Sequence, residues 1–336
     1  MLANLIEREG QECEGHPLPL LVTRLSDLMR LIRESGLPRY QREIGYKEIH
    51  RHLITMIGIS GGLSSQEIVT LTGREKAQIS RAIKPLEQSG LIERESLRAK
   101  LMLLPPGRAI YERIIAISRG RDATLTEGIA EPELRHFMTL SDELTQQAAQ
   151  LYAEERQLSV DAGVISACPG ASGPPVWPRG PDGQEVKPPP ELITPRLIGL
   201  AAYLKRSAML ACQRSHGLSH FQWQVLSLIG EYSPLPLAQL IVLLGRDKSQ
   251  VGRGVAHLEQ EGLIQRSRPT RRRDIVLMPT EAGAVVYEAM QRVAEGREDR
   301  LWSGHSPSDR AFFLEIVARL TENARAMVTR EKGGDA

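Results

Sequence analysis

"GRDKSQVGRGVAHLEQEGLIQR", residues 245–266, nearly repeats an earlier stretch of the same chain, "GREKAQISRAIKPLEQSGLIER", residues 73–94. An offset of 172 aligns the two stretches without a gap, and 12 of their 22 positions are identical. A repeat of this kind indicates two copies of one structural unit. A chain of 336 residues has room for two domains, each with its own core.

The division between the two copies is visible in the composition. Proline and glycine make up nearly half of residues 163–190, which is typical of a linker with polyproline stiffness. We therefore predict a first domain over residues 18–160, a linker over 161–190 and a second domain over 191–330. Trp177 lies within this linker, and packing on a neighbouring domain is the less favoured interpretation of it.

Composition narrows the class of protein. With 4% aromatic residues and abundant Leu, Ala, Glu and Arg, the chain is expected to be mainly α-helical. The net charge is only +2, so any basic function must be local rather than spread over the chain. Three widely spaced cysteines argue against a disulfide framework or a zinc site. Without a signal peptide or a membrane-length apolar stretch, we expect a cytoplasmic protein with no membrane partner.

Each half shows the same order of predicted elements. Amphipathic patterns indicate two opening helices, and a short helix follows at 65–71 or 237–243. After a glycine turn, a further helix lies within each repeated stretch and ends at Gly90 or Gly262. A β-hairpin comes next, over 91–104 or 263–278, and two long helices with apolar stripes close each half. This order predicts a winged helix-turn-helix domain in each half.

The helix in each repeated stretch is the candidate DNA-reading element, because a winged helix-turn-helix places its second helix in the major groove. Its polar face carries side chains that can pair with base edges. A solvated helix surface would be the simpler explanation, but Lys, Gln and Arg recur at matched positions in both copies. The residues are Lys248, Ser249, Gln250, Arg253 and His257 in the second copy, and Lys76, Gln78, Ser80, Arg81 and Lys84 in the first.

The second hairpin carries the strongest local signal. "RSRPTRRR", residues 266–273, holds five arginines in eight residues. Arginines in a narrow minor groove or on phosphates explain this density better than an exposed basic loop does. The candidate wing residues are Arg266, Arg268, Arg271, Arg272 and Arg273 in the second copy, and Arg94, Arg98 and Lys100 in the first.

These features resemble the MarR family of bacterial transcription regulators. The resemblance rests on "LGRDKSQVGRGVAHLEQEGLIQR", on "RRRDIVLMPTEAG" and on the paired long helices, and it covers both halves. It implies that the hairpin is a wing and that Arg273 is its minor-groove residue. Arg271 stands where the family usually has a bracing aspartate, so that brace is in doubt.

Family members pair through their first and last helices as homodimers. Two fused copies would therefore form an intramolecular pseudo-dimer, and whether two such chains associate further is left open. The resemblance also implies small aromatic effectors bound between the dimer helices and the winged domain. The residues on elements bordering such a cleft are Arg24, His50, His220 and Trp223.

The two copies are not expected to be equal. Pro85 lies inside the first reading helix, where it removes a backbone hydrogen bond and should kink or end the helix early. The first wing is shorter. Gly252 and Gly254 weaken the second reading helix, and close approach to DNA could explain them. We predict that the second domain binds DNA more strongly, at a site with unequal halves.

Other chemistry has little support in the sequence. No phosphate loop, dinucleotide fingerprint, nucleophile elbow or zinc-protease motif is present, so we expect no enzyme activity, no cofactor and no bound metal. One alternative to a DNA-binding regulator stays open. The chain could be a protein-interaction module with degenerate winged helices that no longer binds DNA directly, which its near-neutral charge and Pro85 would favour.

Overall fold

The structure is a computed structural model. It describes the backbone of His220 without its side chain, and otherwise residues 20–72, 74–165, 185–186, 188–189, 192–244, 246–267 and 275–333. The described residues are mainly helical, and both halves contain the predicted elements in the predicted order. The fold class is therefore confirmed.

The elements of the first half are α2 (Leu21–Glu43), α3 (Glu48–Ser60), α4 (Ser65–Thr72), α5 (Lys76–Gln88), β1 (Ile92–Glu93), β2 (Met102–Leu103), α6 (Pro105–Leu125) and α7 (Glu131–Asp161). Those of the second half are α8 (Thr194–His216), α9 (His220–Glu231), β3 (Leu235–Pro236), α10 (Leu237–Leu244), α11 (Lys248–Gln260), β4 (Ile264–Ser267), β5 (Val276–Pro279), α12 (Glu281–Leu301) and α13 (Pro307–Gly333). Among the described residues, no helix combines the length and the apolar composition that a membrane span requires.

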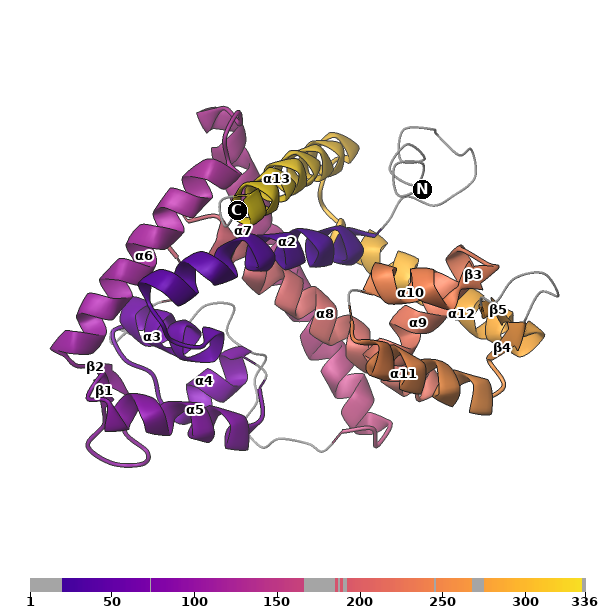
Figure 1. Cartoon of the computed structure of the whole chain (residues 1–336), viewed down its shortest axis with the longest axis horizontal. Coiled ribbons are helices and arrows are strands. Elements are labelled where there is room, and N and C mark those ends of the chain that lie inside the picture. The colour runs from indigo at the N-terminus through magenta and orange to yellow at the C-terminus, as the bar shows by residue number, and fades with distance from the viewer. Residues whose placement is uncertain are drawn as a thin grey trace.

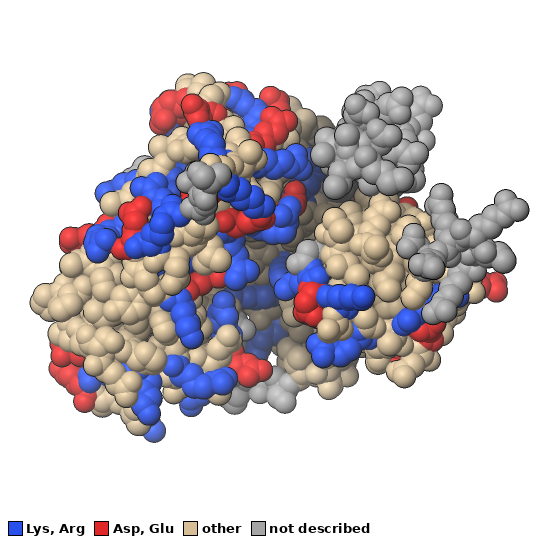
Figure 2. Space-filling model, in the orientation of Figure 1, with Lys and Arg blue, Asp and Glu red and all other residues tan. Residues whose placement is uncertain are grey.

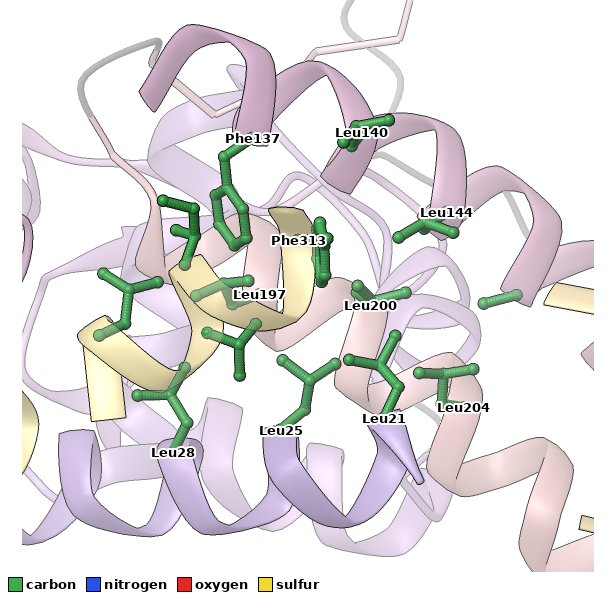
Figure 3. Packing of buried hydrophobic residues seen from close by; sticks show 14 of the residues in the cluster. Leu21, Leu25, Leu28, Phe137, Leu140, Leu144, Leu197, Leu200, Leu204 and Phe313 are labelled. Carbon is green, nitrogen blue, oxygen red and sulfur yellow. The ribbon is translucent and has the colours of Figure 1, made fainter. Parts of the chain in front are cut away.

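The two halves exchange their terminal helices in a central bundle of α2, α7, α8 and α13. Helix α7 of the first half packs on α8 of the second, and α13 of the second packs on α2 of the first. One apolar cluster runs through all four helices (Figure 3). At its centre the rings of Phe137 and Phe313 stack with centroids 4.5 Å apart. The apolar stripes of the terminal helices thus pair within one molecule, and the winged domains lie on opposite sides of the bundle (Figure 1).

A reciprocal pair of helix caps also joins the halves. Asp122 of α6 accepts hydrogen bonds from the backbone N–H (3.0 Å) and the hydroxyl of Thr194, at the start of α8. Glu298 of α12 accepts one from the N–H of Leu21, at the start of α2 (2.9 Å). The first N–H groups of a helix have no partner within it, and a carboxylate there is favoured by the helix dipole. Burial raises the pKa of both carboxyl groups.

Each winged domain has its own apolar core. Ile54, Ile83 and Leu86 are fully or almost fully buried in the first domain, and their counterparts Leu226, Val255 and Leu258 are fully buried in the second. Gly90 (φ 64°) and Gly262 (φ 70°) end the reading helices in the left-handed conformation, as predicted.

Two further glycines, Gly107 and Gly283, allow the helix after each wing to lie close to the start of the hairpin. A Cβ atom at Gly107 would lie 2.0 Å from the carbonyl oxygen of Leu91, and one at Gly283 would lie 1.7 Å from that of Leu263. Only glycine permits this approach of α6 and α12 to the first wing strand. The same contact in both halves shows how closely the copies match.

The sheets of the two domains differ in size. In the second domain β3, β5 and β4 form a three-stranded antiparallel sheet, with four paired residues between β4 and β5. In the first domain β1 and β2 pair over two residues, and a single bridge between Leu63 and Leu101 stands where the second domain has β3. The third strand was not predicted because Leu235–Pro236 is too short to show a periodic pattern.

The prediction that Pro85 ends its helix early is wrong. Helix α5 runs through Pro85 to Gln88, and α11 ends at the equivalent residue, Gln260. Proline removes the hydrogen bond to the carbonyl group of Arg81. Because Pro85 and Arg81 are both exposed, that carbonyl group can be hydrated, and the buried residues Ile83 and Leu86 hold the helix on the core.

Candidate nucleic-acid interface

Helix α11 presents one apolar and one polar face. Val251, Val255 and Leu258 are buried in the domain core. Lys248, Ser249, Arg253 and His257 are exposed, and Gln250 is half-buried. At the helix start, the side chain of Asp247 accepts a hydrogen bond from the N–H of Gln250 (2.8 Å). This cap fixes the first turn, which is where the predicted base-reading side chains begin.

Helix α5 repeats this arrangement with a weaker start. Lys76, Ser80, Arg81 and Lys84 are exposed and Gln78 is half-buried. Glu75 stands at the N-cap, and its side chain makes no capping hydrogen bond. Since aspartate is the better N-cap, the first turn of α5 is held less firmly than that of α11. Figure 2 shows Lys and Arg side chains over the regions of both helices.

The exposed cations of the two reading helices lack acidic partners. Within the described part of the chain, none of the following five forms an ion pair: Lys76, Arg81, Lys84, Lys248 and Arg253. Exposed arginines on other helices are instead commonly paired, as Arg30 is with Asp27, Arg135 with Glu131 and Arg300 with Glu154. Unneutralised cations on an exposed helix face are suited to an anionic partner.

Two predicted DNA-binding arginines have intramolecular partners in the structure. Arg94 forms an ion pair with Glu87 at the end of α5 (Nε to Oε1, 2.8 Å), and Arg266 forms one with Glu259 at the end of α11 (Nε to Oε2, 3.0 Å). These equivalent pairs fasten the first wing strand to the reading helix. Glu87 and Glu259 occupy the same position of the repeat, as do Arg94 and Arg266. This shared Glu and Arg is the sequence feature from which the two ion pairs could have been predicted.

Most of the predicted arginine wing falls outside the described residues. Arg268, Arg271, Arg272 and Arg273 lie in residues 268–274, which the structure does not describe. In the first wing Arg98 and Lys100 are exposed on the loop between β1 and β2.

Sequence reasoning missed Arg74 and Arg246. Each is exposed in the turn before a reading helix, and neither forms an ion pair with a described residue. Both belong to the identical "GR" that opens the repeated stretches. The start of a helix is where backbone N–H groups and the helix dipole favour an anion, so these arginines are well placed for a phosphate group.

The two glycines of α11 have different roles. A Cβ atom at Gly254 would lie 2.7 Å from the ring of Phe221, whereas one at Gly252 would meet no atom within 4 Å. Gly254 is therefore required by packing against α9. Our suggestion that its small size serves close approach to DNA is wrong.

Two of the predicted effector residues, His50 and Trp223, pack against different aromatic rings. His50 packs edge-on against Tyr46, with ring centroids 6.4 Å apart, and burial lowers its pKa. Trp223 stacks on Tyr287 of α12, with centroids 6.2 Å apart. Arg24 lies half-buried on α2, and the side chain of His220 is outside the description. In the part of the chain that is described, no group of three or more His, Cys, Asp or Glu residues could hold a metal ion.

The helix order and the hairpin braced on the reading helix define each half as a winged helix-turn-helix domain. The MarR family model matches residues 44–99 and 216–274, one segment in each half. Both are therefore MarR family domains, and the chain carries them in tandem, as predicted. The family is one of transcription regulators and is not enzymatic, which agrees with the expectation from sequence.

Solved structures that resemble part of the chain each cover 35–40% of it. FabT of Streptococcus pneumoniae in complex with DNA is 19% identical (TM-score 0.33), with 35% of this chain and 85% of that chain covered. A MarR family regulator of Listeria monocytogenes complexed with 26mer DNA is 22% identical (TM-score 0.35), with 40% and 90% covered. A MarR family regulator from Silicibacter pomeroyi gives the same four values. No curated protein matches the chain.

Proposed function

We propose that the chain is a sequence-specific regulator of transcription that binds double-stranded DNA through two winged domains in one polypeptide. Lys248, Ser249, Gln250 and Arg253 of α11 read bases in the major groove, and Lys76, Gln78 and Arg81 of α5 form a second, weaker reading set. Arg268, Arg271, Arg272 and Arg273 contact phosphates or the minor groove.

One observation supports this proposal above the others. Two outward cations recur at matched positions, as Lys76 and Arg81 on α5 and as Lys248 and Arg253 on α11. All four are exposed and have no described acidic partner, although arginines elsewhere on the surface are commonly paired. A surface that needed charge only for solubility would mix both signs. Arg74 and Arg246 extend the cationic surface to the turn before each helix.

DNA binding to the gene's own upstream region tests the proposal directly. Fluorescence anisotropy at two salt concentrations should show tighter binding to this fragment than to random DNA, and weaker binding at the higher salt concentration. Arg253→Ala should reduce the affinity for the specific fragment. Arg135→Ala is the matched control, because Arg135 is an exposed arginine on a bundle helix that is paired with Glu131. Equal affinity for both DNAs would contradict sequence-specific reading.

The two classes of contact should separate by variant. Gln250→Ala should change the sequence preference, whereas Arg273→Ala should weaken binding to all sequences and lower the salt dependence by about one counterion. If both variants act equally on specific and random DNA, this division of roles is wrong.

A protein-interaction module is the second candidate, and one observation favours it. Val242 and Leu243 on α10 are 70% and 43% exposed, where the first domain has Thr70 and Leu71. An apolar pair on the surface is suited to a protein contact. If the second candidate is right, Val242→Thr would disrupt partner binding and the full chain would not bind the upstream fragment at low salt.

A further inference from the structure

A hydrogen bond ties the first winged domain to the opposite half. Arg206 of α8 donates from Nη2 to the carbonyl oxygen of Leu71 in the last turn of α4, over 3.0 Å. The last carbonyl groups of a helix have no partner within it, so this oxygen is a free acceptor. Arg206 is half-buried, and its guanidinium carbon lies 5.7 Å from the centroid of the Tyr203 ring on the same helix. The arginine is thus held beside the turn that precedes α5.

The repeat supplies the comparison. With the offset of 172, Glu34 is the counterpart of Arg206 and Leu243 that of Leu71. Glu34 cannot donate a hydrogen bond as a carboxylate, and it pairs instead with Arg30 (3.2 Å) and Lys332 (2.7 Å). Among the described residues, no hydrogen bond joins α10 to α2. Within the described residues, a hydrogen bond of this kind therefore fastens the first helix-turn-helix to the neighbouring half, and none fastens α10 to α2.

We propose that Arg206 is a positioning residue that holds the turn between α4 and α5 against α8, so that the first reading helix has a fixed position while the second can adjust. This inference rests on the proposed function only where it concerns DNA. A charged donor to a carbonyl group makes one of the stronger intramolecular hydrogen bonds, and here it links residues 135 positions apart.

Hydrogen exchange on the full chain tests the tie without DNA. Arg206→Gln should raise the exchange of the backbone amides of Arg74 and Gln78, the two in residues 74–78 that are hydrogen-bonded, about tenfold, the change expected for the loss of one such bond. The equivalent amides of 246–250 should not change. Glu34→Gln is the matched control and should alter neither turn, and Arg206→Lys should restore part of the protection.

Two results would overturn the inference. One is unchanged exchange in residues 74–78 of the Arg206→Gln variant. The other is an equal rise in both turns together with a lower melting temperature, because that outcome would make Arg206 a general stabilising residue.

A second measurement concerns spacing. DNA fragments with one to three base pairs inserted between the half-sites should lose affinity for the wild-type chain, since only one of its two reading helices can adjust to the changed distance. Arg206→Gln should flatten this dependence, and an unchanged spacing preference would count against positioning. If no fragment is bound by any variant, the proposed function fails, and the exchange experiment still decides on Arg206.

Discussion

The two winged domains have the same reading-helix framework but differ in the features around it. Both reading helices have 13 residues, both end at a left-handed glycine, and both are braced by the same Arg–Glu pair. They differ in the N-cap, in the length of the wing strands and in the tie to the opposite half. The two copies thus share the helix frame and the main reading residues, whereas the features that hold the reading helix and the wing in place differ.

The largest expected effect concerns the two stacked rings at the centre of the bundle. It tests whether the two halves contribute equally to the stability of the core. Phe137→Ala and Phe313→Ala each remove a fully buried ring from one stacked pair, and each should lower the free energy of unfolding by about 3–5 kcal/mol. Chemical denaturation measures both losses. A difference of more than about 1 kcal/mol between the variants would mean that the halves contribute unequally to the core.

A pH dependence should distinguish the first domain from the second. Burial, with a smaller effect of Arg74, lowers the pKa of His52 on α3 from 6.5 to about 4, and the second copy has Gln224 at this position. Between pH 6.5 and pH 4, His52 is protonated in the unfolded chain but neutral in the folded chain. The free energy of unfolding is therefore unaffected by this histidine above pH 6.5 and falls as the pH is lowered towards 4.

His52→Gln should remove this loss. Between pH 7.5 and pH 5, the wild-type chain should lose about 1–2 kcal/mol more than the variant does in urea unfolding. The charges of Glu48 and Arg206 also shift the pKa of this histidine. Gln224→Ala, at the equivalent position, is the control in the other domain. Parallel curves for wild type and His52→Gln would show that the histidine is not kept neutral in the folded state.

DNA-binding measurements would show whether the two reading helices contribute unequally to affinity. Arg253→Ala should weaken binding about 5- to 100-fold, the range for one good base contact, and Arg81→Ala should have a smaller effect. The better capped first turn of α11 and the longer second wing account for the order. Equal footprints over both half-sites, with equal losses in the two variants, would remove the predicted inequality.

The smallest single effect is that of Gly252, one of the two glycines of α11. Gly252→Ala should stabilise the chain by up to about 1 kcal/mol, because its Cβ atom enters open space on a helix. Gly254→Ala should destabilise it by about 1–3 kcal/mol through contact with Phe221. In the first copy, Ala82 stands in place of Gly254 and Ile49 in place of Phe221. Adding Phe221→Ile to Gly254→Ala should therefore recover part of the lost stability. Thermal melting of the three variants measures this coupling.

The repeat and the apolar periodicity were enough to predict the fold. Buried positions such as Val251, Val255 and Leu258 recur at helical spacing, and Gly90 and Gly262 mark helix ends by a conformation that other residues rarely adopt. The early helix end predicted at Pro85 was wrong because a local rule ignored the core contacts of Ile83 and Leu86, which hold the helix on either side.

The candidate interface was predictable only in part. Side-chain exposure on α5 and α11 follows from the same periodicity, so the reading residues could be named from sequence. The partners of Arg94, Arg266 and Arg206 could not, because each depends on how separate elements pack in space. Nothing in the local sequence around Arg206 indicates a bond to a residue 135 positions away.

The reciprocal caps at Thr194 and Leu21 have a consequence for how such a protein can be divided. Each half supplies the acid that completes the first helix of the other, so neither half has all of its own helix ends satisfied. A protein made of two separate chains would lose these contacts on dilution, whereas a fused chain keeps them at any concentration. Covalent joining therefore frees the two domains to accumulate different surfaces without losing their common scaffold.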